Sequence, residues 1–165
     1  LAALAMDAHV SLRSAAGARR VAMADYFLGP MMTARADNEV LLAVHFPLPQ
    51  GDVRVGTAFH EVSERRGDFA VVAAAAHIQL DKDGICSNAA LAIGGADSVP
   101  LRMTALEDRL RGDAITPERI QAVLADVANA LTPGNDQHAS AAYRRRVATV
   151  LAERALTEAA AEAQE

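Results

Sequence analysis

The alternation of apolar and polar residues predicts strands in the first third of the chain. Residues 9–14 alternate polar and apolar side chains, which is the period of a half-buried strand. A turn at residues 15–17 leads to a returning strand over residues 19–23. Residues 39–46 form a strongly apolar strand that ends at Pro47. Residues 1–6 fit the last turn of a helix, and residues 30–38, which lack any period, are expected to form a loop.

Three further strands are predicted at residues 55–62, 69–80 and 85–93. The second of them is apolar on both faces, which suits a buried central strand. Residues 81–84 join it to the third strand as a tight hairpin, with Gly84 available for a positive φ.

Helical periodicity follows these strands. Thr104 and Glu107 predict a capping box, and Gly112 ends that helix. Thr116 is the expected N-cap of a second helix, with Pro117 at its first position. Its apolar face comprises Ile120, Val123, Leu124, Val127 and Leu131.

A last helix is predicted to start near Ser140, and its tail after Thr157 is expected to fray. The side chains that we expect it to bury are Tyr143, Val147, Val150, Leu151 and Leu156. The order of strands and then helices predicts an α+β fold, an antiparallel sheet of about three strands packed against about three helices. Residues 47–52 are the best linker candidate.

Composition narrows the classes of function. Apolar residues make up 52% of the 165 residues, much of that fraction is alanine, and Trp is absent. Such small side chains favour close contact between helix and sheet. The net charge of -5, with both signs interspersed, argues against nucleic-acid binding. No apolar run reaches the ~18 residues of a membrane span. The one cysteine favours a reducing compartment, so the chain is predicted to be soluble and cytoplasmic, and its start at Leu1 suggests a fragment.

Candidate catalytic chemistry is sparse. The five histidines lack the spacing of metal ligands, and Cys86 is expected to be a structural thiol. Gly94 and Gly95 favour a turn at the sheet edge over a phosphate cradle. Residues 144–146, all arginine, are expected on a solvated helix face or at a contact with another subunit. No residue is predicted to be catalytic or to bind a metal, so an independent small-molecule enzyme has little support.

A charged cluster separates the strands predicted at residues 55–62 and 69–80. It contains Glu61, Glu64, Arg65, Arg66 and Asp68. Composition alone predicts a solvated hairpin loop here.

A series of short segments, kept in order, carries a family resemblance. The segments are residues 7–10, 25–29, 39–42 with Pro47, 59–69, 92–95 with Pro100, and Asp136 with 140–145. Together they resemble the FAD-binding medium subunit of molybdenum hydroxylases, the family of carbon monoxide dehydrogenase and xanthine dehydrogenase. The resemblance implies two parts: residues 1–49 as the C-terminal part of a second FAD-binding subdomain, and residues 50–165 as the flavoprotein C-terminal α+β domain. The glycine-rich segments that hold the FAD pyrophosphate are missing, so only the flavin-ring side of the site is expected.

The resemblance also implies which residues border the flavin. Val40 and Leu41 match the strand start whose backbone borders the ring. His60 and Glu61 match positions where family members place a lysine or another polar group, although this chain has no lysine there. Phe69, which Asp68 precedes, matches a residue that packs over the ring face.

The implied function is that of an oxidoreductase subunit. Electrons would pass from iron–sulfur clusters through FAD to an acceptor, with the clusters in a small subunit and the molybdenum cofactor in a large one. With one cysteine, this chain cannot hold such clusters itself. The alternative is a non-catalytic docking domain for assembly of the complex, with FAD held by another part of the subunit.

Overall fold

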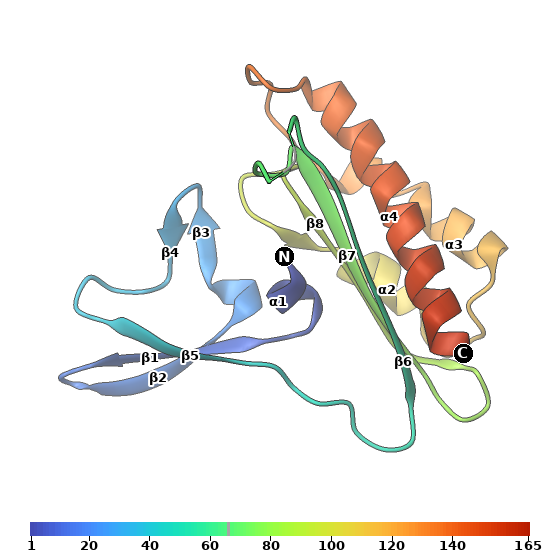
Figure 1. The fold of residues 1–165 in the computed structure, drawn as a ribbon, viewed down its shortest axis with the longest axis horizontal. Coiled ribbons are helices and arrows are strands. Elements are labelled where there is room, and N and C mark those ends of the chain that lie inside the picture. Colours follow the sequence, from blue (N-terminus) through green and yellow to red (C-terminus); the bar gives the residue numbers. More distant parts are fainter. Residues whose placement is uncertain (66) are drawn as a thin grey trace.

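The computed structural model describes residues 1–65 and 67–165, so the predicted role of Arg66 in the charged cluster lies outside the described residues. In Figure 1 the sheet of β1, β2 and β5 diverges from the larger sheet of β6, β7, β8 and β9, which has helices on its far side. We call residues 1–46 the leading unit and residues 54–94 with 101–102 the main sheet.

The leading unit is built on a three-stranded antiparallel sheet in the order β2-β1-β5. Its elements are α1 (Ala2–Ala5), β1 (His9–Ser14), β2 (Gly17–Ala22), η1 (Met23–Asp25), β3 (Phe27–Gly29), β4 (Met32–Thr33) and β5 (Val40–His45). The predicted strands are confirmed. The predicted loop over residues 30–38 is wrong in part, because β4 lies within it and pairs with β3. Two-residue strands carry no alternation that a sequence pattern can detect.

The main sheet is antiparallel in the order β6-β7-β8-β9. Its strands are β6 (Arg54–Val62), β7 (Val72–Leu80), β8 (Cys86–Gly94) and the short β9 (Leu101–Arg102). The central strand β7 is buried at every position but one, as its apolar sequence predicts. Gly84 adopts φ +81° in the turn between β7 and β8, which confirms its expected role.

Helices α2 (Thr104–Leu110), α3 (Pro117–Leu124), η2 (Ala128–Ala130) and α4 (Ala141–Gln164) cover one face of the main sheet. The α+β class, with three long strands and three helices beyond the leading unit, is confirmed. Among the described residues, none of the helices has both the length and the apolar character needed to cross a bilayer.

The buried face of α4 differs from the prediction. Tyr143 and Val150 are 36% and 42% exposed, and the tail does not fray, since the helix continues to Gln164. The residues that it buries are Arg144, Ala148, Leu151, Ala152, Ala155, Leu156, Ala159, Ala160 and Ala163. An alanine face lets the helix backbone approach the sheet closely, and that packing holds the tail in place.

The expected capping box at Thr104 is also wrong. Met103 is the N-cap of α2, without a side-chain capping bond, and Glu107 instead accepts a hydrogen bond from the Leu91 amide at 2.9 Å. The second predicted cap is confirmed, because the Arg119 amide donates to Thr116 Oγ1 at 3.4 Å and Pro117 opens α3.

Candidate functional site

The strand start at Val40 lies at an open sheet edge. Among the described residues β5 pairs only with β1, so its other edge presents unpaired backbone N–H and C=O groups. Val40 and Leu41 are 63% and 37% exposed there. Main-chain hydrogen-bonding groups beside exposed apolar side chains suit a ligand that has a polar edge and an apolar face.

A brace that the sequence analysis missed fixes this strand start. Arg19 donates two hydrogen bonds to the Glu39 carboxylate, at 2.7 and 2.8 Å, and the Ala36 amide donates a third at 2.8 Å. These bonds, that from Arg19 first, lower the pKa of Glu39 to about 2. Glu39 directly precedes Val40, so the backbone enters β5 in a fixed position.

His60 and Glu61 point to opposite faces of β6. The His60 ring Nε2 lies 2.7 Å from Glu158 Oε2 on α4, on the helix side of the sheet. Because side chains alternate along a strand, Glu61 shares its face with Phe59 and Thr57. Both of these line a cavity of about 390 Å³ together with α1. Of the pair, only Glu61 faces the side on which the leading unit lies.

Asp68 and Phe69 lie together at the end of the loop between β6 and β7. Asp68 pairs with Arg65 at 3.1 Å, whereas the Phe69 side chain is 98% exposed. A cavity of about 500 Å³ lies beside them, lined by Glu64, Arg65, Asp68, Phe69, Ala70, Val71, Asp136, His138 and Arg144. Val40 and Leu41 are not in this lining, so this cavity does not join the two predicted parts of the site.

The base of that loop is clamped by Arg144, which the sequence analysis placed on a surface. Its side chain is buried and donates to the carbonyls of Val71 and Gly95 at 2.6 and 2.7 Å. Its Nη2 donates to Asp136 at 2.7 Å. The solvated or inter-subunit role expected for this arginine is therefore wrong. Residue 144 falls on the helix face that also carries Ala148 and Leu151.

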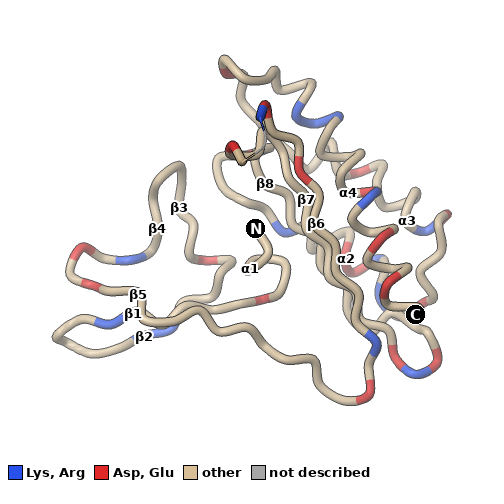
Figure 2. Tube along the Cα trace, in the orientation of Figure 1, with Lys and Arg blue, Asp and Glu red and all other residues tan. Residues whose placement is uncertain are grey.

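The Asp136 carboxylate is held in its ionised form. The amides of Ala139 and His138 each donate to Asp136 Oδ1 at 2.9 Å. The Ala139 amide and then the Arg144 guanidinium lower the pKa of Asp136 to about 2. A second link across the loop joins His138 Nδ1 to Glu64 at 2.8 Å. Charges of both signs thus meet around this loop (Figure 2).

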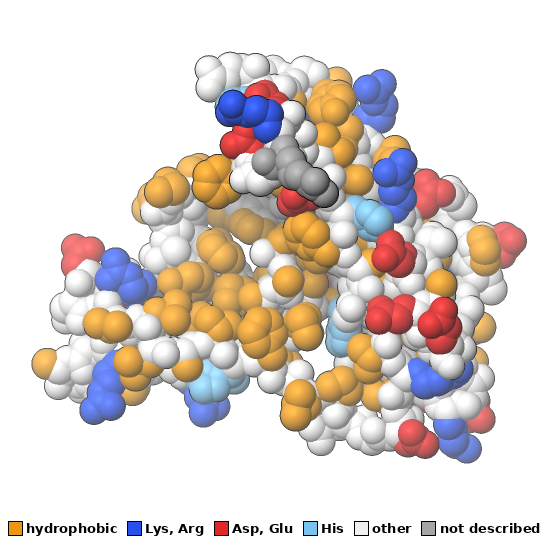
Figure 3. Space-filling model, viewed as in Figure 1, with side chains coloured by type: hydrophobic (Ala, Val, Ile, Leu, Met, Phe, Trp, Pro, Cys, Tyr) orange, Lys and Arg blue, Asp and Glu red, His pale blue; other side chains and the backbone are white. Residues whose placement is uncertain are grey.

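Exposed apolar side chains gather on the leading unit. They are Leu28, Met31, Met32, Val40, Leu41, Leu42, Val44 and Phe46. Figure 3 shows hydrophobic side chains spread over this part of the molecule and around the hollow beside the main sheet. An apolar surface of this kind marks a ligand or partner contact in a soluble protein.

Other reactive groups show no catalytic or metal-binding arrangement among the described residues. Burial raises the pKa of the Cys86 thiol to about 11, so the thiol stays protonated near neutral pH, as expected for a structural cysteine. In the part of the chain that the structure describes, no three His, Cys, Asp or Glu side chains gather as metal ligands. The histidine pair His9 and His45 is stacked, with ring centroids 4.6 Å apart.

The residues present fit the ring of a flavin and not its pyrophosphate. A flavin ring needs one covered face and hydrogen-bonding groups at its polar edge, and the exposed β5 offers both kinds of group. A pyrophosphate cradle needs a glycine-rich loop that opens a helix. Instead, the described helices α1, α2, α3 and α4 follow Leu1, Met103, Thr116 and Ser140.

Comparison with known protein families divides the chain into two matched segments. The family described as CO dehydrogenase flavoprotein C-terminal domain matches residues 57–159. The family described as FAD binding domain in molybdopterin dehydrogenase matches residues 1–49.

Individual relatives agree with these families. The chain is 32% identical to the 6-hydroxypseudooxynicotine dehydrogenase complex subunit alpha of Paenarthrobacter nicotinovorans, over 94% of this chain and 52% of that protein. It is 29% identical to the xanthine dehydrogenase FAD-binding subunit of Escherichia coli O157:H7, over 97% of this chain and 54% of that protein. The chain thus spans about half the length of the curated relatives that it matches.

A solved structure extends the likeness to three dimensions. Carbon monoxide dehydrogenase from Hydrogenophaga pseudoflava, in a form that lacks the Mo-pyranopterin moiety of its cofactor, superposes with a TM-score of 0.89 at 28% identity. The match covers 98% of this chain and 55% of that one.

Proposed function

We propose that this chain, which belongs to the family of the CO dehydrogenase flavoprotein C-terminal domain, forms the flavin-ring side of an FAD site in an oxidoreductase subunit. The match of residues 1–49 to an FAD-binding domain supports the choice of cofactor. Because the chain spans about half the length of its relatives, the pyrophosphate and adenine ends of FAD would be held by the other half of such a subunit.

The chain would contribute two parts to that subunit. Residues 1–49 are proposed to be the C-terminal part of its second FAD-binding subdomain, and residues 50–165 its C-terminal α+β domain. The separate sheets of the leading unit and the main sheet, joined through residues 46–53, support this division.

The open edge of β5 is the observation that carries the proposal. Its backbone at Val40 and Leu41 would donate and accept hydrogen bonds at the polar rim of the ring, while the exposed apolar side chains of the strand exclude water from its face. The brace from Arg19 to Glu39 keeps these backbone groups in place before the ligand arrives.

The remaining proposed contacts come from the main sheet. Glu61 would face the site from β6, and Phe69 with Asp68 would approach it from the loop that follows β6. His60, whose side chain pairs with Glu158, is proposed to contribute through the backbone beside Glu61. Among the six, we propose that Val40, Leu41 and Glu61 meet the ligand directly, since Val40 and Leu41 are exposed on β5 and Glu61 shares its strand face with Thr57 and Phe59, which line the cavity beside α1.

Bound FAD would supply the electron-carrying chemistry of the complex, between iron–sulfur clusters and an acceptor. We propose that the clusters belong to a small subunit and the molybdenum cofactor to a large subunit. The names of two relatives, a subunit of a dehydrogenase complex and an FAD-binding subunit of xanthine dehydrogenase, support this arrangement. A cytoplasmic location is part of the same proposal, and the unpaired Cys86 favours a reducing compartment.

Flavin titration of the complete subunit, carrying Val40→Asp, tests the proposal. A carboxylate at this position would be desolvated against the ring, so FAD affinity should fall by at least about tenfold. Val150→Asp is the matched control, because Val150 is also a partly exposed valine but lies on α4. Equal FAD affinity in the Val40→Asp and Val150→Asp subunits would contradict a ring contact at β5.

A docking role is the second candidate function, and the 98% exposure of Phe69 favours it. Burial of Arg144 removes that arginine from the assembly surface on which this alternative drew. Phe69→Ala in the same subunit separates the two functions. If Phe69 is a docking residue, the substitution should weaken recovery of the partner subunits and leave FAD affinity unchanged. If Phe69 contacts the ring, the substitution should instead weaken FAD binding.

A further inference from the structure

On the main sheet, the apolar contact with the leading unit is made by small side chains. Leu4 and Ala5 of α1 pack in one cluster with Ala75 of β7 and Ala92 of β8. Alanine side chains offer no ridge that would stop a short helix from sliding along the sheet. Since apolar burial is also non-directional, it holds the unit on the sheet without setting its position there.

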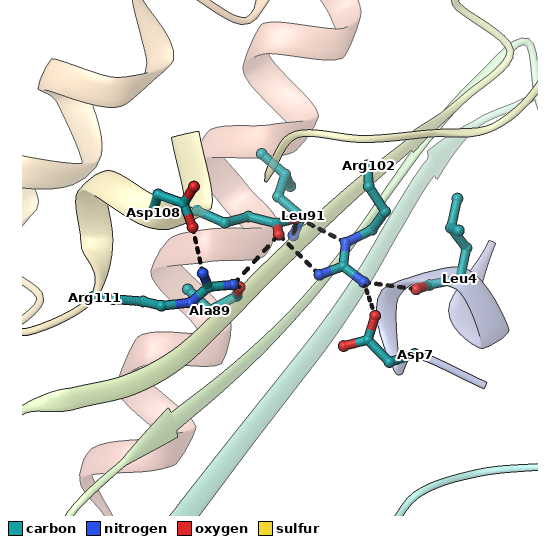
Figure 4. Close-up of polar contacts among 8 residues, drawn as sticks. Leu4, Asp7, Ala89, Leu91, Arg102, Asp108 and Arg111 are labelled. Carbon is teal, nitrogen blue, oxygen red and sulfur yellow. Dashed lines mark hydrogen bonds and ion pairs between the residues drawn. The ribbon is translucent and has the colours of Figure 1, made fainter. Parts of the chain in front are cut away.

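A directional contact is made at the same place by Arg102 of β9. Its guanidinium donates from Nε and Nη2 to the two oxygens of Glu107, at 2.7 and 2.8 Å. Its Nη1 donates to the Leu4 carbonyl at 3.0 Å and to Asp7 Oδ1 at 2.6 Å. Figure 4 shows Arg102 between the strand of Leu91 and the helix end at Leu4.

The inner half of this network fixes the guanidinium. Glu107 is 1% exposed and also accepts the Leu91 amide at 2.9 Å, so it is anchored to β8 from within the core. A two-bonded arginine–carboxylate pair sets the plane and direction of the guanidinium. Nη1 is therefore held pointing at α1, where the Leu4 carbonyl lies at the helix end and also accepts a hydrogen bond from the Asp7 amide at 3.2 Å.

We infer that Arg102 is a positioning residue that fixes the leading unit against the main sheet. It thereby sets the distance between β5 and β6, the two strands that we propose to border the flavin. The path from Arg102 to the site runs along β1. Asp7 lies two residues before β1, whose near end pairs with β5 at His9↔His45, whereas Val40 pairs with Arg13 at the far end. Holding Asp7 therefore fixes the near end of the β1–β5 pair and, through these paired strands, the direction in which Val40 lies from the main sheet. The link to flavin rests on the proposed function. The fixing of α1 by Arg102, which we call the latch, rests on the contacts alone.

Two variants test the latch in the 165-residue chain. Arg102→Lys keeps the charge but offers one nitrogen, which cannot serve Glu107 and α1 together. Asp7→Asn removes the outer charge and suits the positive φ of 52° at this position, which asparagine tolerates. Arg109→Lys is the matched control, because Arg109 also bonds one carboxylate and one carbonyl, but between α2 and α3.

Hydrogen exchange of the peptide that spans residues 2–8 is the first readout. Arg102→Lys, which loses its hydrogen bond to α1, should speed this exchange by about tenfold. Asp7→Asn keeps an acceptor but loses the charge of a side chain that is 62% exposed, so it should speed the exchange by about twofold to fivefold. Exchange in β7 and β8 and in the control should stay unchanged. Wild-type exchange at residues 2–8 in both test variants would overturn the latch.

The second readout is made on the complete FAD-loaded subunit. Arg102→Lys and Asp7→Asn should weaken FAD binding by about threefold or more and change the circular dichroism of the flavin bands, whereas Arg109→Lys should do neither. Faster exchange with wild-type flavin signals would overturn the positioning role. If the wild-type subunit binds no FAD, the proposed function fails and the flavin link with it, while the exchange result still supports or overturns the latch.

Discussion

At the residue scale, a buried arginine and a glycine determine how α4 packs against the main sheet. Arg144 clamps the start of the helix, and Gly56 of β6 lets the helix backbone approach. A Cβ at Gly56 would lie 1.9 Å from the Ala159 carbonyl oxygen and 2.6 Å from the Ala163 nitrogen. Both neighbours are backbone atoms, so they cannot move aside without moving the helix.

Gly56→Ala is therefore expected to lower the free energy of unfolding by about 1–3 kcal/mol, the range for overpacking. Gly134→Ala is the control, because a Cβ there meets no atom within 4 Å. Its effect should be neutral or slightly stabilising. Urea unfolding of the three proteins measures the difference. Equal unfolding midpoints for Gly56→Ala and wild type would show that α4 does not pack as closely as described.

At the element scale, the segment before α4 depends on an ionised carboxylate. Asp136 accepts from Arg144, which in turn holds the carbonyls of Val71 and Gly95. The folded pKa of Asp136 is about 2, below its ordinary value of 3.8. The folded state therefore binds fewer protons than the unfolded state between these two values, and its stability rises with pH across that window.

The wild-type chain should accordingly lose unfolding free energy as the pH falls from about 4 to about 2. Asp136→Asn should be less stable at neutral pH and lose less over the same window. Urea unfolding at half-unit pH steps checks this, and the comparison between proteins cancels the similar titration of Glu39. Parallel stability curves for the two proteins below pH 4 would contradict the role given to Asp136.

The elements themselves were predictable where the pattern is local. Alternation located β1, continuous apolar runs bounded by turn residues located β5 and β7, and the Thr116 cap located α3. The inward face of α4 was not predictable in this way, because an alanine-rich helix has little contrast between its faces. Tyr143 and Val150 were chosen by hydrophobicity, although the sheet admits only small side chains along most of the helix.

At the scale of the whole molecule, the proposed site depends on two sheets that only the fold brings near each other. Sequence resemblance named Val40, Leu41, His60, Glu61, Asp68 and Phe69, but local patterns could not show that His60 faces α4 or that Phe69 is fully exposed. Arg102 was missed for the same reason. Its partners Leu4 and Asp7 lie more than ninety positions away in the chain.

The most direct test of the central claim is photolabelling of the complete subunit with an FAD analogue that carries an azide on its isoalloxazine ring. Mass spectrometry of the labelled peptides then locates the ring. We expect label in the peptide that contains β5, and in the peptide that contains Glu61. Label confined to α4, or found only in the half of the subunit outside these 165 residues, would contradict the account.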